Sequence, residues 1–337
     1  MGAHGWPPRL PAAILVTASM MFSAMAQVHS SQAAGLPVAL IQANAALQAG
    51  EADKALGLLR AIPQSDASAA QAANLECRVR MTLEQWDAAI GACERAIRMD
   101  GQNSNYHVWL GRALGEKADR ASFLTAFGLA KRVRSEFEEA VRLDPRNAGA
   151  LADLGQFYEQ APSVVGGGIE KAETIAAQLE SLDQPRAHHL RGQIAEQRKD
   201  YGTAEREYKQ AITSSPHPGS QWMELAGFYR RHQRWDDMEF AIRLGDSVTQ
   251  RDRVEGLALY DGASLLTETH RDPARAARML DDYLAGSPKT EEAPAFAALI
   301  RLARLRDQLG ETAAANRERA AALAMANEYK PVENSGH

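Results

Sequence analysis

The sequence is poor in several features that define common protein classes. Cysteine occurs only twice in 337 residues, which excludes a scaffold built on disulfides and a four-cysteine zinc site. Aromatic residues make up 6% of the chain and the formal charge is −5, so the basic excess typical of nucleic-acid binding is missing. Few aromatics with abundant alanine favour close-packed helices over a β-sandwich. The length predicts about two domains or one elongated array.

Long apolar runs are also scarce, and the clearest one lies near the N-terminus. The segment 11–26 is apolar and small, follows Arg9, and ends in Ala24-Met25-Ala26. This pattern predicts a secretory signal peptide over 1–26 with cleavage after Ala26. A membrane anchor is the alternative, but 16 residues fall short of the ~20 that span a bilayer. We therefore expect a periplasmic or secreted protein without a membrane span.

The rest of the chain shows helical apolar spacing and a recurring period. Ala55 and Ala89 are 34 residues apart, as are Ala204 and Met238. Residues 222–229 read W-x2-L-A-x2-Y. Small residues at matching places on two consecutive helices allow the two backbones to approach closely, while the large residues fill the space between hairpins. The sequence therefore predicts helical hairpins repeated in tandem.

This pattern resembles the tetratricopeptide repeat, a helix–turn–helix unit of 34 residues. The resemblance implies an all-α, right-handed superhelical solenoid of about eight hairpins over 36–329. A short linker at 27–35 precedes the array, and a disordered tail at 330–337 follows it. The last helix, 311–329, is expected to cap the array.

Two insertions interrupt the period, near 119–130 and 161–168. The first separates a helix at 104–118 from a second helix expected at 131–147. The region 104–172 also resembles exported bacterial repeat proteins of poorly defined function. More loosely, it is similar to the helical repeats of regulators of microtubule dynamics, which share an extended hairpin here.

The family resemblance implies that the first helix of each hairpin lines a concave surface on which peptide partners bind. The expected concave residues are mixed in character and suit a polar peptide, although each could instead be an ordinary solvated residue: Asn105, Val108, Arg112, Gln156, Glu159, His189, Gln193, Met223 and Arg230. The Lys-Asn pattern with which some relatives grip chaperone carboxylates is absent. Val108, Arg112, Ala152 and Gln156 occupy the corresponding places.

Cys77 and Cys93 fall on the two helices of one expected hairpin, and both should point into its interior. In an oxidising compartment they could form a disulfide. The alternative is two small buried hydrophobic side chains.

Metal and anion sites have weak support. His188 and His189 are adjacent and diverge by about 100° on a helix, so they cannot share one ion. Gly166-Gly167-Gly168 precedes a helix but lacks the G-K-[ST] of a phosphate loop. We expect a flexible turn there, or a loop that folds against a partner or against the extended hairpin.

The sequence therefore predicts an exported repeat scaffold that binds a protein or peptide partner on its concave surface, without catalysis, cofactor or metal. Two alternatives remain open. The protein could be a structural subunit that bridges components of an envelope assembly, or an accessory protein in envelope or polysaccharide processing. Nothing in the sequence names the partner or the oligomeric state.

Overall fold

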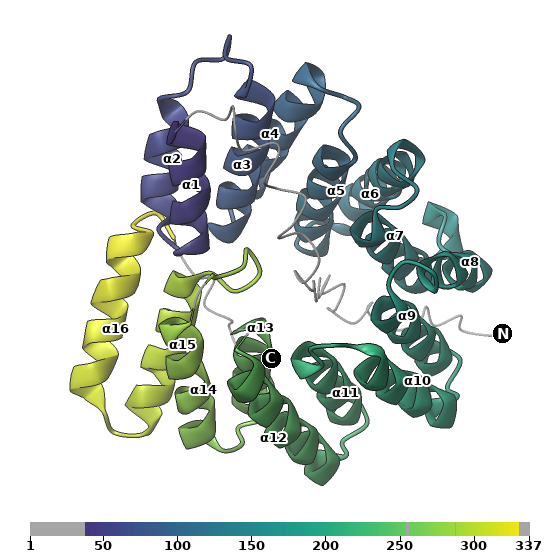
Figure 1. The fold of residues 1–337 in the computed structure, drawn as a ribbon, viewed down its shortest axis with the longest axis vertical. Helices are drawn as coiled ribbons and strands as arrows, with labels where there is room; N and C mark the ends of the chain where they lie inside the picture. The colour runs from purple at the N-terminus through teal and green to yellow at the C-terminus, as the bar shows by residue number, and fades with distance from the viewer. Residues whose placement is uncertain (1–37, 254–255, 287, 330–337) are drawn as a thin grey trace, which may run out of the picture.

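The computed structural model describes residues 38–253, 256–286 and 288–329 (Figure 1). Sixteen α-helices and a short 3-10 helix account for most of these residues, and no strand occurs among them. The predicted all-α solenoid is confirmed. The predicted signal peptide at 1–26, the linker at 27–35 and the tail at 330–337 lie outside the described residues.

The helices pair in chain order into eight hairpins. Their bounds are α1 (Val38–Gln48) and α2 (Ala52–Arg60); α3 (Ala69–Thr82) and α4 (Trp86–Met99); α5 (Ser104–Asp119) and α6 (Phe123–Leu143); α7 (Ala148–Gln160) and α8 (Ile169–Leu179); α9 (Gln184–Gln197) and α10 (Tyr201–Ser214); α11 (Gly219–Arg231) and α12 (Trp235–Asp252); α13 (Gly256–Glu268) and α14 (Pro273–Ala285); α15 (Ala295–Gln308) and α16 (Thr312–Met325). The 3-10 helix η2 (Ser163–Val165) lies between α7 and α8.

The turns inside the hairpins repeat as regularly as the helices. A residue with positive φ stands between the two helices at Gly50 and Glu84, and again at Lys199 and Gln233, each pair 34 residues apart. At Lys199 the turn is closed by two backbone bonds, from its own N–H to Glu196 O and from the following N–H to Ala195 O (both 2.9 Å). This left-handed ending satisfies the last carbonyls of the first helix and reverses the chain.

The hairpins stand side by side around a ring (Figure 1). The odd-numbered helices from α3 to α13 face the centre, and their even-numbered partners form the outer layer. Consecutive odd-numbered helices from α1 to α13 contact one another along the inner layer. The first helices therefore form the concave surface.

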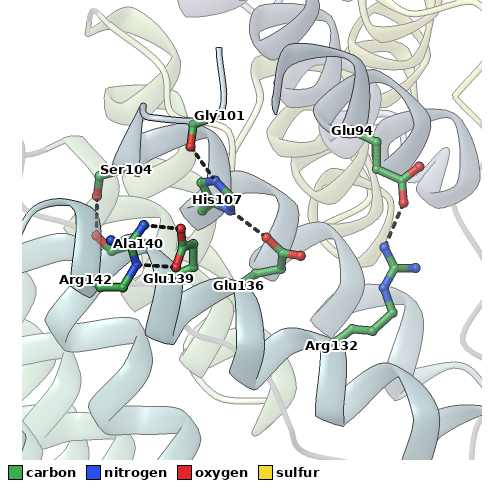
Figure 2. Close-up of polar contacts among 9 residues, drawn as sticks. All are labelled: Glu94, Gly101, Ser104, His107, Arg132, Glu136, Glu139, Ala140 and Arg142. Atoms are coloured by element: carbon green, nitrogen blue, oxygen red, sulfur yellow. Dashed lines mark hydrogen bonds and ion pairs between the residues drawn. The ribbon is translucent and has the colours of Figure 1, made fainter. Parts of the chain in front are cut away.

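The hairpin of α5 and α6 corrects one expectation. The second helix begins at Phe123 rather than at 131, because most of the inserted residues extend the helix instead of forming a loop. Leu129 and Val133 on this helix are buried against the α5 side of the hairpin core. Figure 2 shows the polar contacts that fix the pair: Ser104 Oγ donates to Ala140 O (2.9 Å), and His107 lies between Gly101 O and Glu136.

The second insertion folds against this same hairpin. Gly166 has φ of +100°, and its carbonyl accepts a hydrogen bond from Lys171 Nζ (2.8 Å). Arg134 of α6 donates to Val165 O (3.3 Å), and a Cβ on Gly166 would lie 1.8 Å from Arg134 Nη1. Of the two interpretations of this loop, contact with the extended hairpin is therefore the one that the structure supports.

The two ends of the array meet, which corrects the expectation that the last helix is a cap. α16 packs beside α2, and one apolar cluster joins Leu40 and Leu56 of the first hairpin to Phe296 and Ala322 of the last. Backbone groups add to this closure, since Lys289 N–H donates to Gln48 O (2.7 Å). We call this junction the seam: α1–α3 on one side, and residues 288–294, α15, α16 and Tyr329 on the other.

Candidate functional site

The concave face is the candidate site, and the structure removes some of the predicted residues from it. Val108 packs against Ala140 and Ala150, while Met223 lies beside Gly245 and Gly262. Both side chains are buried, because these positions face the second helix or the next hairpin instead of the centre. The prediction that Val108 and Met223 are open to a partner is therefore wrong.

Three of the predicted concave residues that are charged or can become charged reach the next repeat. The Arg112 Nε atom donates to Asp153 Oδ2 (2.7 Å), and this ion pair is buried. His189 Nδ1 lies 2.7 Å from Glu224 Oε2. Arg230 pairs with Glu268. These contacts tie α5 to α7, α9 to α11, and α11 to α13, so much of the charge on the inner face holds neighbouring repeats together.

Four further predicted residues lie on the inner helices α5, α7 and α9. Asn105 is exposed and accepts a hydrogen bond from Asn147 Nδ2 (3.1 Å). Gln156 and Gln193 are half-buried, and among the described residues Gln156 Nε2 has no hydrogen-bond partner. Glu159 is buried, and its carbonyl accepts from Gln197 Nε2 (2.8 Å). Asn105 is thus the most exposed polar side chain of these four, whereas the Nε2 atom of Gln156 is buried.

The carboxyl group of Glu159 has an unusual protonation equilibrium. Burial, and then the like charge of Glu196, raise the pKa of Glu159 to about 7, although His189 and Arg231 act in the opposite direction. A buried carboxyl next to another carboxylate favours its neutral form. Glu159 can therefore donate a hydrogen bond near neutral pH.

Cys77 and Cys93 form a disulfide between α3 and α4, with their Cα atoms 5.2 Å apart. Both residues are fully buried. Of the two interpretations of these cysteines, the structure supports the disulfide. The bond fixes the helix that carries Arg78, which contacts the opposite side of the seam.

The histidine pair behaves as expected for adjacent helical residues. His188 Nδ1 lies 2.8 Å from Glu207 on α10, whereas His189 points to Glu224 on α11. Within the described ranges, no group of three or more His, Cys, Asp or Glu side chains could hold a metal ion. The same part of the chain contains no helix long and apolar enough to cross a membrane.

Reasoning from the sequence missed a cavity on the inner side of the seam. It measures about 270 Å³ and is lined from both sides of the junction. Trp109 and Arg112 come from α5, whereas Tyr260, Arg301 and Tyr329 come from the C-terminal repeats. A repeat period relates equivalent positions in neighbouring units, so it does not pair residues that lie so far apart in the chain.

The aromatic walls of this cavity carry guanidinium groups. The Arg78 and Arg112 side chains lie over the Trp109 ring, 5.1 and 4.7 Å from its centroid. Arg301 lies 4.9 Å from the centroid of Tyr260. Cations stabilised by ring faces thus surround this cavity.

Comparison with known proteins agrees with the repeat geometry. Residues 185–218 match the family model described as "Tetratricopeptide repeat", and this segment covers the hairpin of α9 and α10. This hairpin is a tetratricopeptide repeat. The matched repeat contains Gly192 on α9 and Ala204 on α10, small residues 12 positions apart on the two helices of one hairpin, and both are buried in the structure.

Two solved structures are similar to this chain. A tetratricopeptide repeat protein from Parabacteroides merdae shares 13% identity, with a TM-score of 0.44, over 82% of this chain and 97% of that one. The human IFIT1 dimer with PPP-AAAA shares 13% identity, with a TM-score of 0.42, over 82% of this chain and 69% of that one. No curated protein sequence matches the chain significantly.

Proposed function

We propose that this protein is an exported scaffold that binds a protein or peptide partner on the inner face of its ring, and that its role is binding rather than catalysis. The observation that supports this most directly is the inner layer itself. It presents polar side chains such as Asn105, Gln156 and Gln193 from consecutive first helices, the face with which tetratricopeptide repeats usually bind peptides.

The proposal of export rests on two independent features. The segment 1–26 has the composition and the A-x-A ending of a signal peptide. The disulfide between Cys77 and Cys93 supports the same conclusion, since such bonds persist in oxidising compartments and are rare in reducing ones. Periplasmic or secreted localisation is therefore the proposal. N-terminal sequencing of the mature protein, expected to begin at Gln27, tests it.

A pull-down from envelope extract tests the binding face. The inner-face variant is Gln156→Ala with Gln193→Ala, and the matched outer variant is Gln178→Ala with Gln210→Ala, which changes exposed glutamines on α8 and α10. We expect the wild type and the outer variant to capture the same partner at equal yield, and the inner variant to capture much less. Equal capture by all three proteins would refute binding at this part of the inner face.

A second candidate function, bridging of an envelope assembly, is favoured by an exposed apolar pair. Phe123 and Leu124 at the start of α6 are 67% and 83% exposed. Apolar side chains grouped at the tip of a hairpin are typical of contact surfaces. If this tip bridges subunits, the double variant Phe123→Ser, Leu124→Ser should no longer be recovered in a large stoichiometric complex. The control is Phe240→Ser, which changes an exposed position on α12 and should leave the complex intact.

A further inference from the structure

The cavity at the seam is formed by residues that only a closed ring brings together. Met81 and Trp109 reach it from the N-terminal side, and Pro294, Arg301 and Tyr329 reach it from the C-terminal side. At about 270 Å³ it suits a short stretch of chain better than a folded partner. An occupant that contacts both sides would bind the closed ring better than an open one and would stabilise closure.

Most ionisable groups on the cavity lining already have partners. Tyr329 donates a hydrogen bond to Glu84 Oε1 (3.1 Å). Burial and the charge of Glu291 raise the pKa of Glu292 to about 7, so this carboxyl group is about half protonated near neutral pH. The lining as a whole therefore favours neither a basic nor a strongly acidic occupant. The remaining ion pairs join Arg112 to Asp153, Arg120 to Glu116, and Glu291 to Arg78.

Arg301 is the cation of this lining that has no carboxylate partner. Within the described ranges it forms no ion pair, and its guanidinium lies 4.9 Å from the centroid of the Tyr260 ring. Pro294 and Ala297 precede it by seven and four residues on the same face of α15, and both also line the cavity. This wall therefore suits a segment that offers an apolar side chain next to one carboxylate.

The chain itself supplies such a segment. The described residues stop at Tyr329, which is part of the cavity wall, and the sequence continues as Lys330-Pro331-Val332-Glu333. Val332 follows Tyr329 by three residues, a reach of about 10 Å in extended chain. A segment tethered so closely has an effective concentration in the millimolar range, so contacts of modest strength are enough to keep it bound.

We propose that residues 330–333 bind in the seam cavity, with Val332 against the apolar wall and Glu333 paired with Arg301, and that this contact helps to hold the ring closed. The sequence alone predicts a disordered tail at 330–337, because that stretch is mostly polar. The cavity beside Tyr329 supplies the apolar wall and the cation that the tail lacks by itself. The occupant is a segment of this chain, so the inference goes beyond the proposed binding of a partner.

A peptide added in trans tests this contact. The peptide Lys-Pro-Val-Glu-Asn-Ser-Gly, with both ends blocked, has the sequence of residues 330–336. Calorimetry measures its binding to the full chain and to a variant that stops after Tyr329. We expect the truncated variant to bind the peptide, and the full chain to bind it at least tenfold more weakly, because its own segment fills the cavity. The fluorescence of Trp86 and Trp109, which line the cavity, should follow the same binding.

Matched substitutions locate the contact. In the truncated variant, Arg301→Gln should weaken the peptide roughly three- to fivefold, whereas Arg317→Gln, at an exposed position on α16, should leave its affinity unchanged. The Glu333→Gln peptide should bind the truncated variant roughly three- to fivefold more weakly and should be insensitive to Arg301→Gln, since the two groups form one pair. The Val332→Ser peptide should also bind more weakly, and the Ser335→Ala peptide should not.

Hydrogen exchange reports the consequence for the ring. Amides in α1–α2 and α15–α16 should exchange faster in the truncated variant than in the full chain, and added peptide should restore their protection. An unchanged circular dichroism spectrum shows that the truncated variant is folded.

Three results would each overturn the inference: equal affinity of the peptide for the full and truncated chains, no binding to the truncated variant at millimolar peptide, or no effect of Arg301→Gln. The pull-down with the inner-face variant is read separately, because it changes Gln156 and Gln193 and leaves the seam intact. Loss of the partner in that pull-down, with no binding of the peptide, would leave the scaffold function standing and remove the seam contact.

Discussion

The junctions inside the array and the seam that closes it use similar contacts, but they join residues at very different distances along the chain. Between α9 and α11, Arg231 Nη2 contacts Glu196 Oε2 at 2.8 Å, and His232 reaches the same carboxylate. At the seam, Arg78 contacts Glu291. The first contact spans 35 residues, about one repeat, whereas the second spans 213 residues.

This difference matters for stability. In an open array, each hairpin is stabilised by its neighbours, and the terminal hairpins have only one neighbour each. Here the first and last hairpins share one apolar cluster, which includes Leu40, Leu56 and Phe296. The seam therefore acts as one more junction, and the terminal hairpins should resist opening as the internal ones do.

The largest expected loss of stability comes from two substitutions, one at the seam and one inside the array, each of which truncates a buried aromatic side chain. Phe296→Ala at the seam and Phe228→Ala inside the array each remove a ring that is at most 1% exposed, and each should cost about 3–5 kcal/mol. Hydrogen exchange distinguishes the regions. Phe296→Ala should expose amides in α1–α2 as well as in α15–α16, whereas Phe228→Ala should leave α1–α2 protected. Faster exchange confined to α15–α16 would show that the seam contributes little.

Removing the disulfide should have the next largest effect. The bond closes a loop across one hairpin, with a sequence separation of 16 residues. The double variant Cys77→Ala, Cys93→Ala should therefore lose about 3 kcal/mol in the free energy of unfolding measured by urea. Reductant should lower the midpoint of the wild type and leave that of the variant unchanged. Unaltered wild-type stability in reductant would contradict the structural role of the bond.

Alanine substitutions at two glycines of the hairpin of α5 and α6 should change stability by intermediate amounts and in opposite directions. A Cβ on Gly111 of α5 would lie 2.4 Å from Phe137 Cε1, whereas a Cβ on Gly128 of α6 would meet nothing within 4 Å. Gly111→Ala should destabilise the protein by about 1–3 kcal/mol through overpacking. Gly128→Ala should stabilise it by about 0.5–1 kcal/mol through helix propensity. Equal shifts in thermal midpoint would show that the close approach at Gly111 is not required.

The sequence predicts the contacts between neighbouring repeats much better than the seam. A repeat period shows which residues occupy equivalent positions in adjacent units. That period placed Ala204 on the second helix of a hairpin, and it placed Cys77 and Cys93 on the two helices of one hairpin. The period does not report whether the array closes, since closure depends on the accumulated rotation of all hairpins. The contact between Arg78 and Glu291 therefore had no signal in the sequence.

The predictions for two of the concave residues were wrong for a related reason. Repeat position placed Val108 and Met223 on a first helix, but the helix face that each occupies depends on how tightly the next hairpin packs. The start of α6 at Phe123 was missed because the inserted residues continue a helix and break only the period. A regular pattern is thus informative about the units and less informative about where an insertion extends one of them.

The smallest expected effect is the pH dependence of stability that arises from His107, which lies between α5 and α6 and away from the seam. Burial alone would lower the pKa of His107, but hydrogen bonds with Glu136 and with Gly101 O, together with the negative charge of Glu136 and Glu139, leave it above 6.5. The folded state therefore binds the proton more tightly than the unfolded state. This stabilisation is fully present below pH 6.5 and is lost as the pH rises through the higher pKa of the folded protein.

Urea unfolding measured across this range should show that the wild type loses more stability with rising pH than His107→Gln does. Glu136→Gln keeps the histidine but removes its main partner, so it should flatten the same slope (Figure 2). Phe296→Ala at the seam removes no ionisable group, so it should shift stability at all pH values and leave the slope unchanged. A slope that changed with the seam variant and not with the His107 variant would assign the pH dependence to closure of the ring.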